Sequence, residues 1–203
     1  ALHIPTTLDG YPVTKINNYA FDGESAIVTV TMPNTVTWIG YKAFWGATDT
    51  VKSPGLAVAS SGNLSSVTLS NSLVTIRGYA FASQPKLTTF TVPNTVTTIE
   101  AYAFRHDTGL TSINLGTGLT SLGAWAFHDC RALTSITVPS GVTSIEKATF
   151  FGATSLSTVT LPSGITHMGQ YSFSGTALTN VTLPTSLTTI DQSVFRGIPT
   201  LTS

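Results

Sequence analysis

Apolar and polar residues recur along this chain in a unit of about 23 residues. Phenylalanine marks one position of the unit, and its copies lie 23, 37, 23, 23, 23, 23 and 22 residues apart: Phe21, Phe44, Phe81, Phe104, Phe127, Phe150, Phe173 and Phe195. The long interval holds 14 extra residues (37 against 23), and the last lacks one residue near Thr176. This self-similarity predicts a solenoid in which each unit forms one coil and stacks on the next.

Each unit contains a short segment in which inward and outward residues alternate. Two consecutive examples are Ile136-x-Val138 and Val159-x-Leu161. A period of two is typical of a β-strand, and no stretch of ten or more residues has helical periodicity. A proline follows most of these segments and ends the strand at one place in the coil. We therefore predict one strand per coil, with parallel strands stacked about 4.8 Å apart over a continuous apolar core.

The unit from Leu133 to Phe150 reads LTSITVPSGVTSIEKATF and resembles the repeat of the BspA-like leucine-rich-repeat family. The resemblance covers essentially the whole chain. It implies a right-handed leucine-rich-repeat solenoid with a parallel β-sheet, α/β by class convention but β-rich, of the kind found in bacterial and protozoan surface proteins. The chain departs from the family pattern at Ser70 and Gly116, where proline is expected, and at Ala148 and Ser193, where an aromatic residue is usual.

We expect residues 1–203 to form a single leucine-rich-repeat domain of about eight coils, with an insertion near residues 47–61. Both ends cut a repeat short, because Leu2 and Ile4 occupy strand positions and Leu201 stops where the next strand would begin. An uncapped end of a solenoid exposes apolar core and an unpaired strand edge. We therefore expect the native protein to continue on at least one side.

The charge balance narrows the range of partners. Only 9% of the residues are charged, and nine basic side chains balance nine acidic ones. Nucleic acids and anionic membranes require a basic face, so we expect neither as a partner. No apolar run approaches the roughly 20 residues of a membrane span. The neutral, hydroxyl-rich surface instead suits a protein or glycan, such as a host or matrix component.

Outward strand positions form columns of small hydroxylated residues. We predict that this sheet face is a platform for a protein or glycan partner, with these candidate ligand-binding residues: Thr29, Thr31, Thr68, Thr89, Thr91, Thr137, Thr158 and Thr160. The alternative is that threonine merely suits strands and keeps the sheet soluble. Ice binding is a further alternative, although Asn114, Asn180 and several serines interrupt the regular array.

Aromatic residues form a second column, two positions before the phenylalanines: Tyr19, Tyr79, Tyr102, Trp125 and Tyr171. These rings could contact sugars or a partner, or they could pack along the edge of the solenoid. Trp38, Tyr41 and Trp45 are less well explained by the repeat and lie in one coil beside the insertion. We predict that these three form an aromatic contact patch. The insertion itself suits either a recognition loop or a neutral bulge.

Two adjacent coils carry zinc-type ligands at equivalent positions: His106, Asp107, His128, Asp129 and Cys130. Stacking would place His106 beside Asp129, and likewise Asp107 beside Cys130, within about 5 Å. However, flanking arginines add positive charge, and no third coil supplies a ligand. We therefore expect no bound metal and no cofactor.

No group of residues has the spacing of a catalytic site. The sequence offers neither a nucleophile with its base nor a phosphate-binding loop. Glu100 and Glu146 occupy the same repeat position, but they lie two coils apart and not side by side. We therefore predict a non-catalytic binding or adhesion module, which the resemblance places in a secreted or cell-surface protein. The alternative is a structural spacer or accessory domain that holds another domain away from the cell surface.

Overall fold

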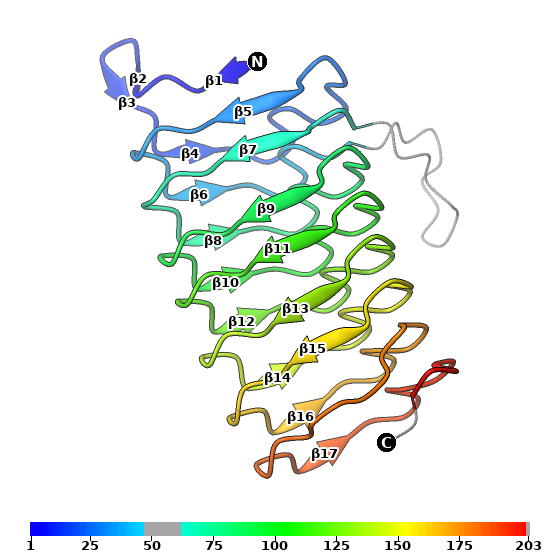
Figure 1. The fold of residues 1–203 in the computed structure, drawn as a ribbon. Coiled ribbons are helices and arrows are strands. Elements are labelled where there is room, and N and C mark those ends of the chain that lie inside the picture. The colour runs from blue at the N-terminus through cyan, green and yellow to red at the C-terminus, as the bar shows by residue number, and fades with distance from the viewer. Residues whose placement is uncertain (47–61, 202–203) are drawn as a thin grey trace.

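The computed structural model describes residues 1–46 and 62–201, so the expected insertion at 47–61 lies outside the described residues. The described chain winds into a stack of coils built from short strands and turns (Figure 1). No helix in the described part of the chain is long and apolar enough to cross a membrane. The prediction of a β-rich solenoid with parallel strands is confirmed.

Most coils contribute two short strands rather than the single one predicted. The first ladder carries the segments with alternating residues: β1 (Leu2–His3), β5 (Thr29–Thr31), β7 (Ser66–Thr68), β9 (Thr89–Thr91), β11 (Ser112–Asn114), β13 (Ser135–Thr137) and β15 (Thr158–Thr160). The second ladder consists of two-residue strands: β4 (Lys15–Ile16), β6 (Trp38–Ile39), β8 (Thr75–Ile76), β10 (Thr98–Ile99), β12 (Ser121–Leu122), β14 (Ser144–Ile145), β16 (His167–Met168) and β17 (Thr189–Ile190). Both ladders are divided into separate sheets, and within each sheet the strands of successive coils pair in parallel and in register.

A hairpin precedes the regular coils. Strands β2 (Thr7–Leu8) and β3 (Tyr11–Pro12) pair in antiparallel fashion. Between them, Asp9 and Gly10 have φ values of 50° and 83°, as a two-residue hairpin turn requires.

The phenylalanines that mark the repeat form one stack through the core. Neighbouring ring centroids lie 5.1 to 5.9 Å apart from Phe21 to Phe195. The centroids of Phe44 and Phe81 are 5.5 Å apart, although the insertion separates these residues in the sequence. The repeat register therefore survives the insertion, as predicted.

The turn that leads into each phenylalanine has a left-handed residue two positions before the ring. This residue has a φ between 52° and 64° in every coil: Tyr19, Lys42, Tyr79, Tyr102, Trp125, Ala148, Tyr171 and Ser193. Backbone hydrogen bonds between coils hold the turns, for example from Phe104 N to Ala126 O (2.9 Å). Because Ala148 and Ser193 adopt the same conformation as the aromatic residues, the turn does not depend on an aromatic side chain.

The last expected strand of the first ladder is absent. Residues 180–182 have no strand conformation, and β15 is the final strand of this ladder within the described chain. This coil has one residue fewer, and Thr176 near the deletion bonds its hydroxyl to Phe173 O (2.8 Å). The shorter path explains why the segment does not reach the ladder in register.

Candidate functional site

The threonines predicted to contact a partner lie on the outward side of the first ladder. Seven of the eight are exposed, and Thr29 is half-buried. The residues between them point into the core, as Phe90 does between Thr89 and Thr91 with 4% of its surface exposed. Parallel pairing in register aligns equivalent residues, so that Thr137 of β13 lies opposite Thr160 of β15. The strands thus present an outward face rich in hydroxyl groups.

Several hydroxyl groups elsewhere on the solenoid donate to the backbone of the neighbouring coil. Thr111 Oγ1 donates to Thr88 O (2.9 Å), and Thr120 Oγ1 donates to Thr97 O (3.2 Å). The same kind of bond recurs in other coils, with the donors Thr37, Thr134, Ser157, Thr166 and Thr188. In contrast, none of the eight predicted threonines makes a side-chain hydrogen bond within the described chain. Sequence alone did not separate these two sets of hydroxyl groups.

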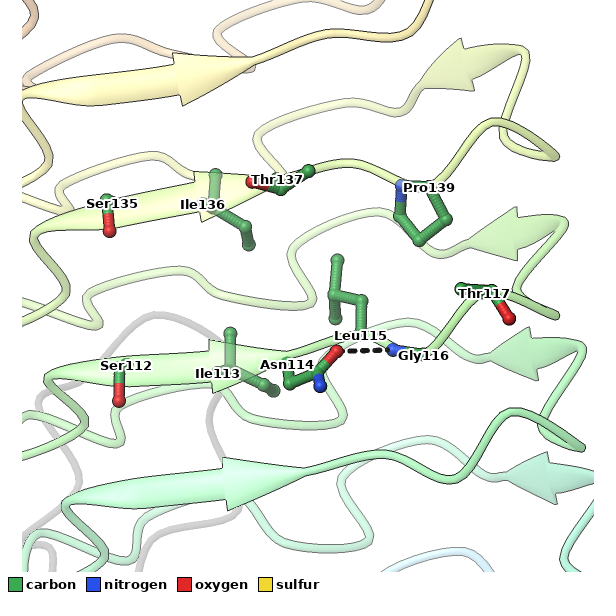
Figure 2. Close-up of a pocket in the computed structure, with 10 residues that line it drawn as sticks. All are labelled: Ser112, Ile113, Asn114, Leu115, Gly116, Thr117, Ser135, Ile136, Thr137 and Pro139. Carbon is green, nitrogen blue, oxygen red and sulfur yellow. Dashed lines mark hydrogen bonds between the residues drawn. The ribbon is translucent and has the colours of Figure 1, made fainter.

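Two hollows interrupt the face of the first ladder. One, of about 320 Å³, lies between β11 and β13 (Figure 2). Its polar lining consists of Ser112, Asn114, Thr117, Ser135 and Thr137. The other, of about 310 Å³, lies between β7 and β9 beside Thr68, Asn71 and Thr91. Both lie where pairing stops, because within the described part of the chain β7 is not paired with β9, nor β11 with β13.

These interruptions follow two coils that lack a proline. In three coils that have it, the residue before the proline donates its N–H to the next coil: Met32 to Thr68 O (3.0 Å), Val92 to Asn114 O (2.8 Å) and Val138 to Thr160 O (3.0 Å). Proline favours this bond because it restricts the preceding residue to extended conformations. Where Ser70 and Gly116 replace proline, Leu69 and Leu115 make no such bond within the described residues. The two missing prolines are therefore the sequence signal for the hollows.

The aromatic column stacks along the edge of the solenoid. The rings of Tyr79 and Tyr102 lie 4.6 Å apart at 10°, and those of Tyr102 and Trp125 lie 6.0 Å apart at 12°. Burial, together with Tyr102, raises the pKa of Tyr79 above its ordinary value. Stacking covers the ring faces, through which aromatic side chains contact sugars. The geometry therefore favours edge packing over sugar contact for this column.

The three aromatic residues predicted as a patch lie in different surroundings. Trp38 is on β6, with the guanidinium carbon of Arg77 5.4 Å from its ring centroid. Tyr41 lies beside the aromatic column, edge-on to Tyr79 at 5.6 Å. Trp45 is only 8% exposed. Tyr41 and Trp45 share the neighbours Tyr79 and Lys42, whereas no ring contact joins Trp38 to either in the described residues. The structure therefore brings two of the three together.

The predicted proximity of His106 and Asp129 is present, and a third residue joins them. Asp129 Oδ2 lies 3.5 Å from His106 Nδ1 and 3.7 Å from His128 Nδ1. Burial lowers the pKa of His106, and the guanidinium of Arg105 lowers it further. Burial likewise lowers the pKa of His128 to about 4, against the opposing effect of Asp129. Both imidazoles are therefore neutral at neutral pH.

Asp107 and Cys130 lie deeper and are separate from this group. Both side chains are fully buried. Cys130 Sγ donates to Phe104 O (3.1 Å), and Asp107 Oδ1 accepts from Gln84 N (2.8 Å). Burial raises the pKa of the Asp107 carboxyl and that of the Cys130 thiol well above their ordinary values. A protonated thiol bound to a core carbonyl is a structural feature and a poor metal ligand.

Solved bacterial structures with leucine-rich repeats are similar to this chain. A leucine-rich repeat protein of T. pallidum is 28% identical; the match covers 85% of this chain and 74% of that one, with a TM-score of 0.75. A leucine-rich repeat protein from Bacteroides ovatus is 28% identical over 96% of this chain and 54% of that one, with a TM-score of 0.73. A leucine-rich cell surface protein from Faecalibacterium prausnitzii is 29% identical over 100% of this chain and 46% of that one, with a TM-score of 0.64. The chain thus spans about half the length of the latter two.

The repeat itself has a family match. No curated protein matches the chain. Six copies of the BspA type leucine-rich repeat region match residues 4–54 and 74–202, which together make up most of the sequence. The chain therefore belongs to the BspA-type leucine-rich repeat family.

Proposed function

We propose that this chain is a non-catalytic binding module of a secreted or cell-surface bacterial protein, and that it recognises a protein or glycan through the face of the first ladder. The observation that carries the proposal is a difference between two sets of hydroxyl groups, those at the coil corners and those on the face of the first ladder. At several coil corners, the positions directly before a strand, the hydroxyl group donates a hydrogen bond to the backbone of the neighbouring coil, as in Thr111 and Thr120. Those of the face are exposed and make no side-chain hydrogen bond in the described chain. Such groups can exchange water for a partner at little cost.

The family supports a role at the surface. BspA-type proteins are often surface proteins with binding roles, and the similar Faecalibacterium prausnitzii structure is that of a leucine-rich cell surface protein. Solenoids bind through extended surfaces made by the same position of successive repeats. The hydroxyl face of the first ladder has this repeated character.

The shape and charge of the face favour an elongated, neutral partner. The face carries no run of like charge, since its outward positions are threonine, serine and asparagine. The hollow beside Asn114 and Thr137 breaks its flatness and offers amide and hydroxyl groups in a recess (Figure 2). A glycan or an extended peptide, which present many hydrogen-bonding groups along their length, would match these features.

Charge introduced on the face tests the proposal. We expect the double variant Thr91→Lys, Thr137→Lys to weaken binding at least about tenfold, because two ammonium groups would have to be desolvated against a neutral partner. The measurement is binding of purified protein to an array of glycans and extracellular matrix proteins, followed by affinity measurement on each hit. Both substitutions are at exposed positions, so the melting temperature should not change.

The matched control places lysine on the second ladder. Thr97→Lys with Ser121→Lys adds the same charge at exposed positions of the same coil range but at the second ladder, where Ser121 lies on β12 and Thr97 directly precedes β10. This control should retain the affinity of the parent protein. Equal affinity of parent, face variant and control would remove the face as the binding surface, and absence of any hit would favour the structural spacer.

A further inference from the structure

Outside the first ladder, the side chains of His106, His128 and Asp129 form a group of possible metal ligands. It lies between two stacked turns, and the hydrogen bond from His106 N to His128 O (2.8 Å) fixes their relative position. The possible ligand atoms of the three side chains all lie within 4.8 Å of one another. We propose that these three side chains bind a zinc ion, which links the two turns.

The distances are close to those of a tetrahedral site. Zinc bonds of about 2.0–2.2 Å to nitrogen and oxygen place neighbouring ligand atoms about 3.3–3.5 Å apart. Asp129 Oδ2 is already 3.5 Å from His106 Nδ1 and 3.7 Å from His128 Nδ1. The third pair of ligand atoms, on His106 and His128, lies within 4.8 Å, so binding requires side-chain rotations that bring these two atoms closer. A solvent molecule would take the fourth position, since each of the three side chains retains some exposure.

The hydrogen bonds at the site leave a place for a cation. Arg105 Nε donates to His128 Nδ1 (3.4 Å), so this nitrogen carries no proton. It nevertheless faces a carboxylate oxygen of Asp129, which is also an acceptor. Two acceptors that face each other without a hydrogen atom between them repel, and a bound cation would relieve that repulsion.

The backbone supplies an independent argument. His106 and Asp129 occupy equivalent positions of successive turns, with φ values of 61° and 57°. Other coils have glycine at this position, with φ values of 69° to 72°: Gly23, Gly152, Gly175 and Gly197. A left-handed conformation favours glycine, and residues that retain it without being glycine cluster at functional sites. Ser83, with a φ of 64°, is a third non-glycine residue at this position. Of these three residues, His106 and Asp129 are potential zinc ligands, and they lie in adjacent coils.

Two arginines oppose zinc binding, so removing an arginine side chain should strengthen the site. Arg105 competes with zinc for the lone pair of His128 Nδ1, and Arg131 Nε contacts Asp129 Oδ1 at 3.4 Å. Removal of the Arg105 guanidinium should therefore tighten zinc binding, which a purely structural ion-pair cluster would not show.

The test titrates metal-free protein with zinc chloride by calorimetry, and with Co²⁺ by absorption spectroscopy. We expect one zinc ion per chain and an increase in melting temperature of roughly 5–10 °C at a hundredfold excess over the dissociation constant. His106→Gly should weaken binding more than about tenfold. This variant introduces the residue that other coils use at the same position, so that it should fold at least as stably as the parent without metal. Asp129→Asn provides a second, nearly isosteric loss of a ligand, and Arg105→Gln should increase the affinity.

Two controls separate this site from adventitious binding. His167 and Asp191 form another histidine–aspartate pair, with 3.6 Å between Nε2 and Oδ2, on an exposed part of the second ladder. His167→Gln should leave zinc affinity unchanged. Cys130→Ser should also bind zinc, because its thiol is bonded to a core carbonyl. No zinc binding by the parent, undiminished binding by His106→Gly and Asp129→Asn, loss of binding in His167→Gln, or a thiolate charge-transfer band with Co²⁺ would each overturn the proposal.

Discussion

Phe127→Ala should lower the free energy of unfolding by about 3–5 kcal/mol, a large part of the stability of an ordinary domain. The ring is fully buried, with its centroid 5.4 Å from that of Phe104 and 5.7 Å from that of Phe150. Alanine would remove both stacking contacts and leave a cavity between coils, which the rigid turns cannot close. Urea denaturation followed by far-ultraviolet circular dichroism measures the loss.

The end of the same stack provides the control. Phe195 is only half-buried, and its ring contacts a single phenylalanine, Phe173, at 5.9 Å. Phe195→Ala should therefore cost clearly less than Phe127→Ala, on the order of half as much. Equal losses at the two positions would contradict the view that the continuous stack holds the central coils together.

The phenylalanine stack could be predicted because a single residue type marks it in every coil. In a solenoid, equivalent positions of successive repeats must contact one another, so the spacing alone determines which rings meet. The insertion did not disturb this inference, since Phe44 and Phe81 stack across it. Register is thus the property that sequence determines most firmly in this fold.

The second ladder could not be predicted from alternation. Its strands have two residues, of which one points inward, as Ile99 does in β10. Two residues cannot display a period, so the segment resembles any other turn that contains one apolar side chain. The conspicuous alternation of the first ladder therefore led to one strand per coil where two exist.

For a related reason, the candidate sites could be predicted only in part from the sequence. Stacking of equivalent positions brought His106 to Asp129 but did not indicate His128, which belongs to the same turn as Asp129 and reaches the group through its side-chain direction. Similarly, Thr91 on the face and Thr111 at a corner look alike in sequence, yet only the hydroxyl of Thr111 is bound to a neighbouring coil. Side-chain direction and hydrogen-bond partners require coordinates.

Gly116→Pro should destabilise the protein by about 3 kcal/mol or more, although proline is the residue that the repeat favours at this position. The backbone of Gly116 has a φ of 68°, which the proline ring cannot adopt. Its N–H also donates to Asn114 Oδ1 (3.0 Å), a bond that proline would remove (Figure 2). Thermal and urea denaturation of the variant beside the parent protein provide the measurement.

Ser70→Pro is the matched substitution at the other hollow and should change stability much less. Ser70 is not among the described residues with positive φ, so its backbone lacks the left-handed conformation that excludes proline at Gly116. The variant loses the bond from Ser72 N to Ser70 Oγ (3.1 Å). Proline reduces the conformational entropy of the unfolded chain, which favours the folded state. It also holds Leu69 in an extended conformation, in which the Leu69 N–H can pair with the next coil. Stability should therefore stay within about 1 kcal/mol of the parent, and hydrogen exchange at Leu69 should slow. If both variants lost the same stability, the difference in backbone conformation would not explain why one coil accepts the family's proline and the other cannot.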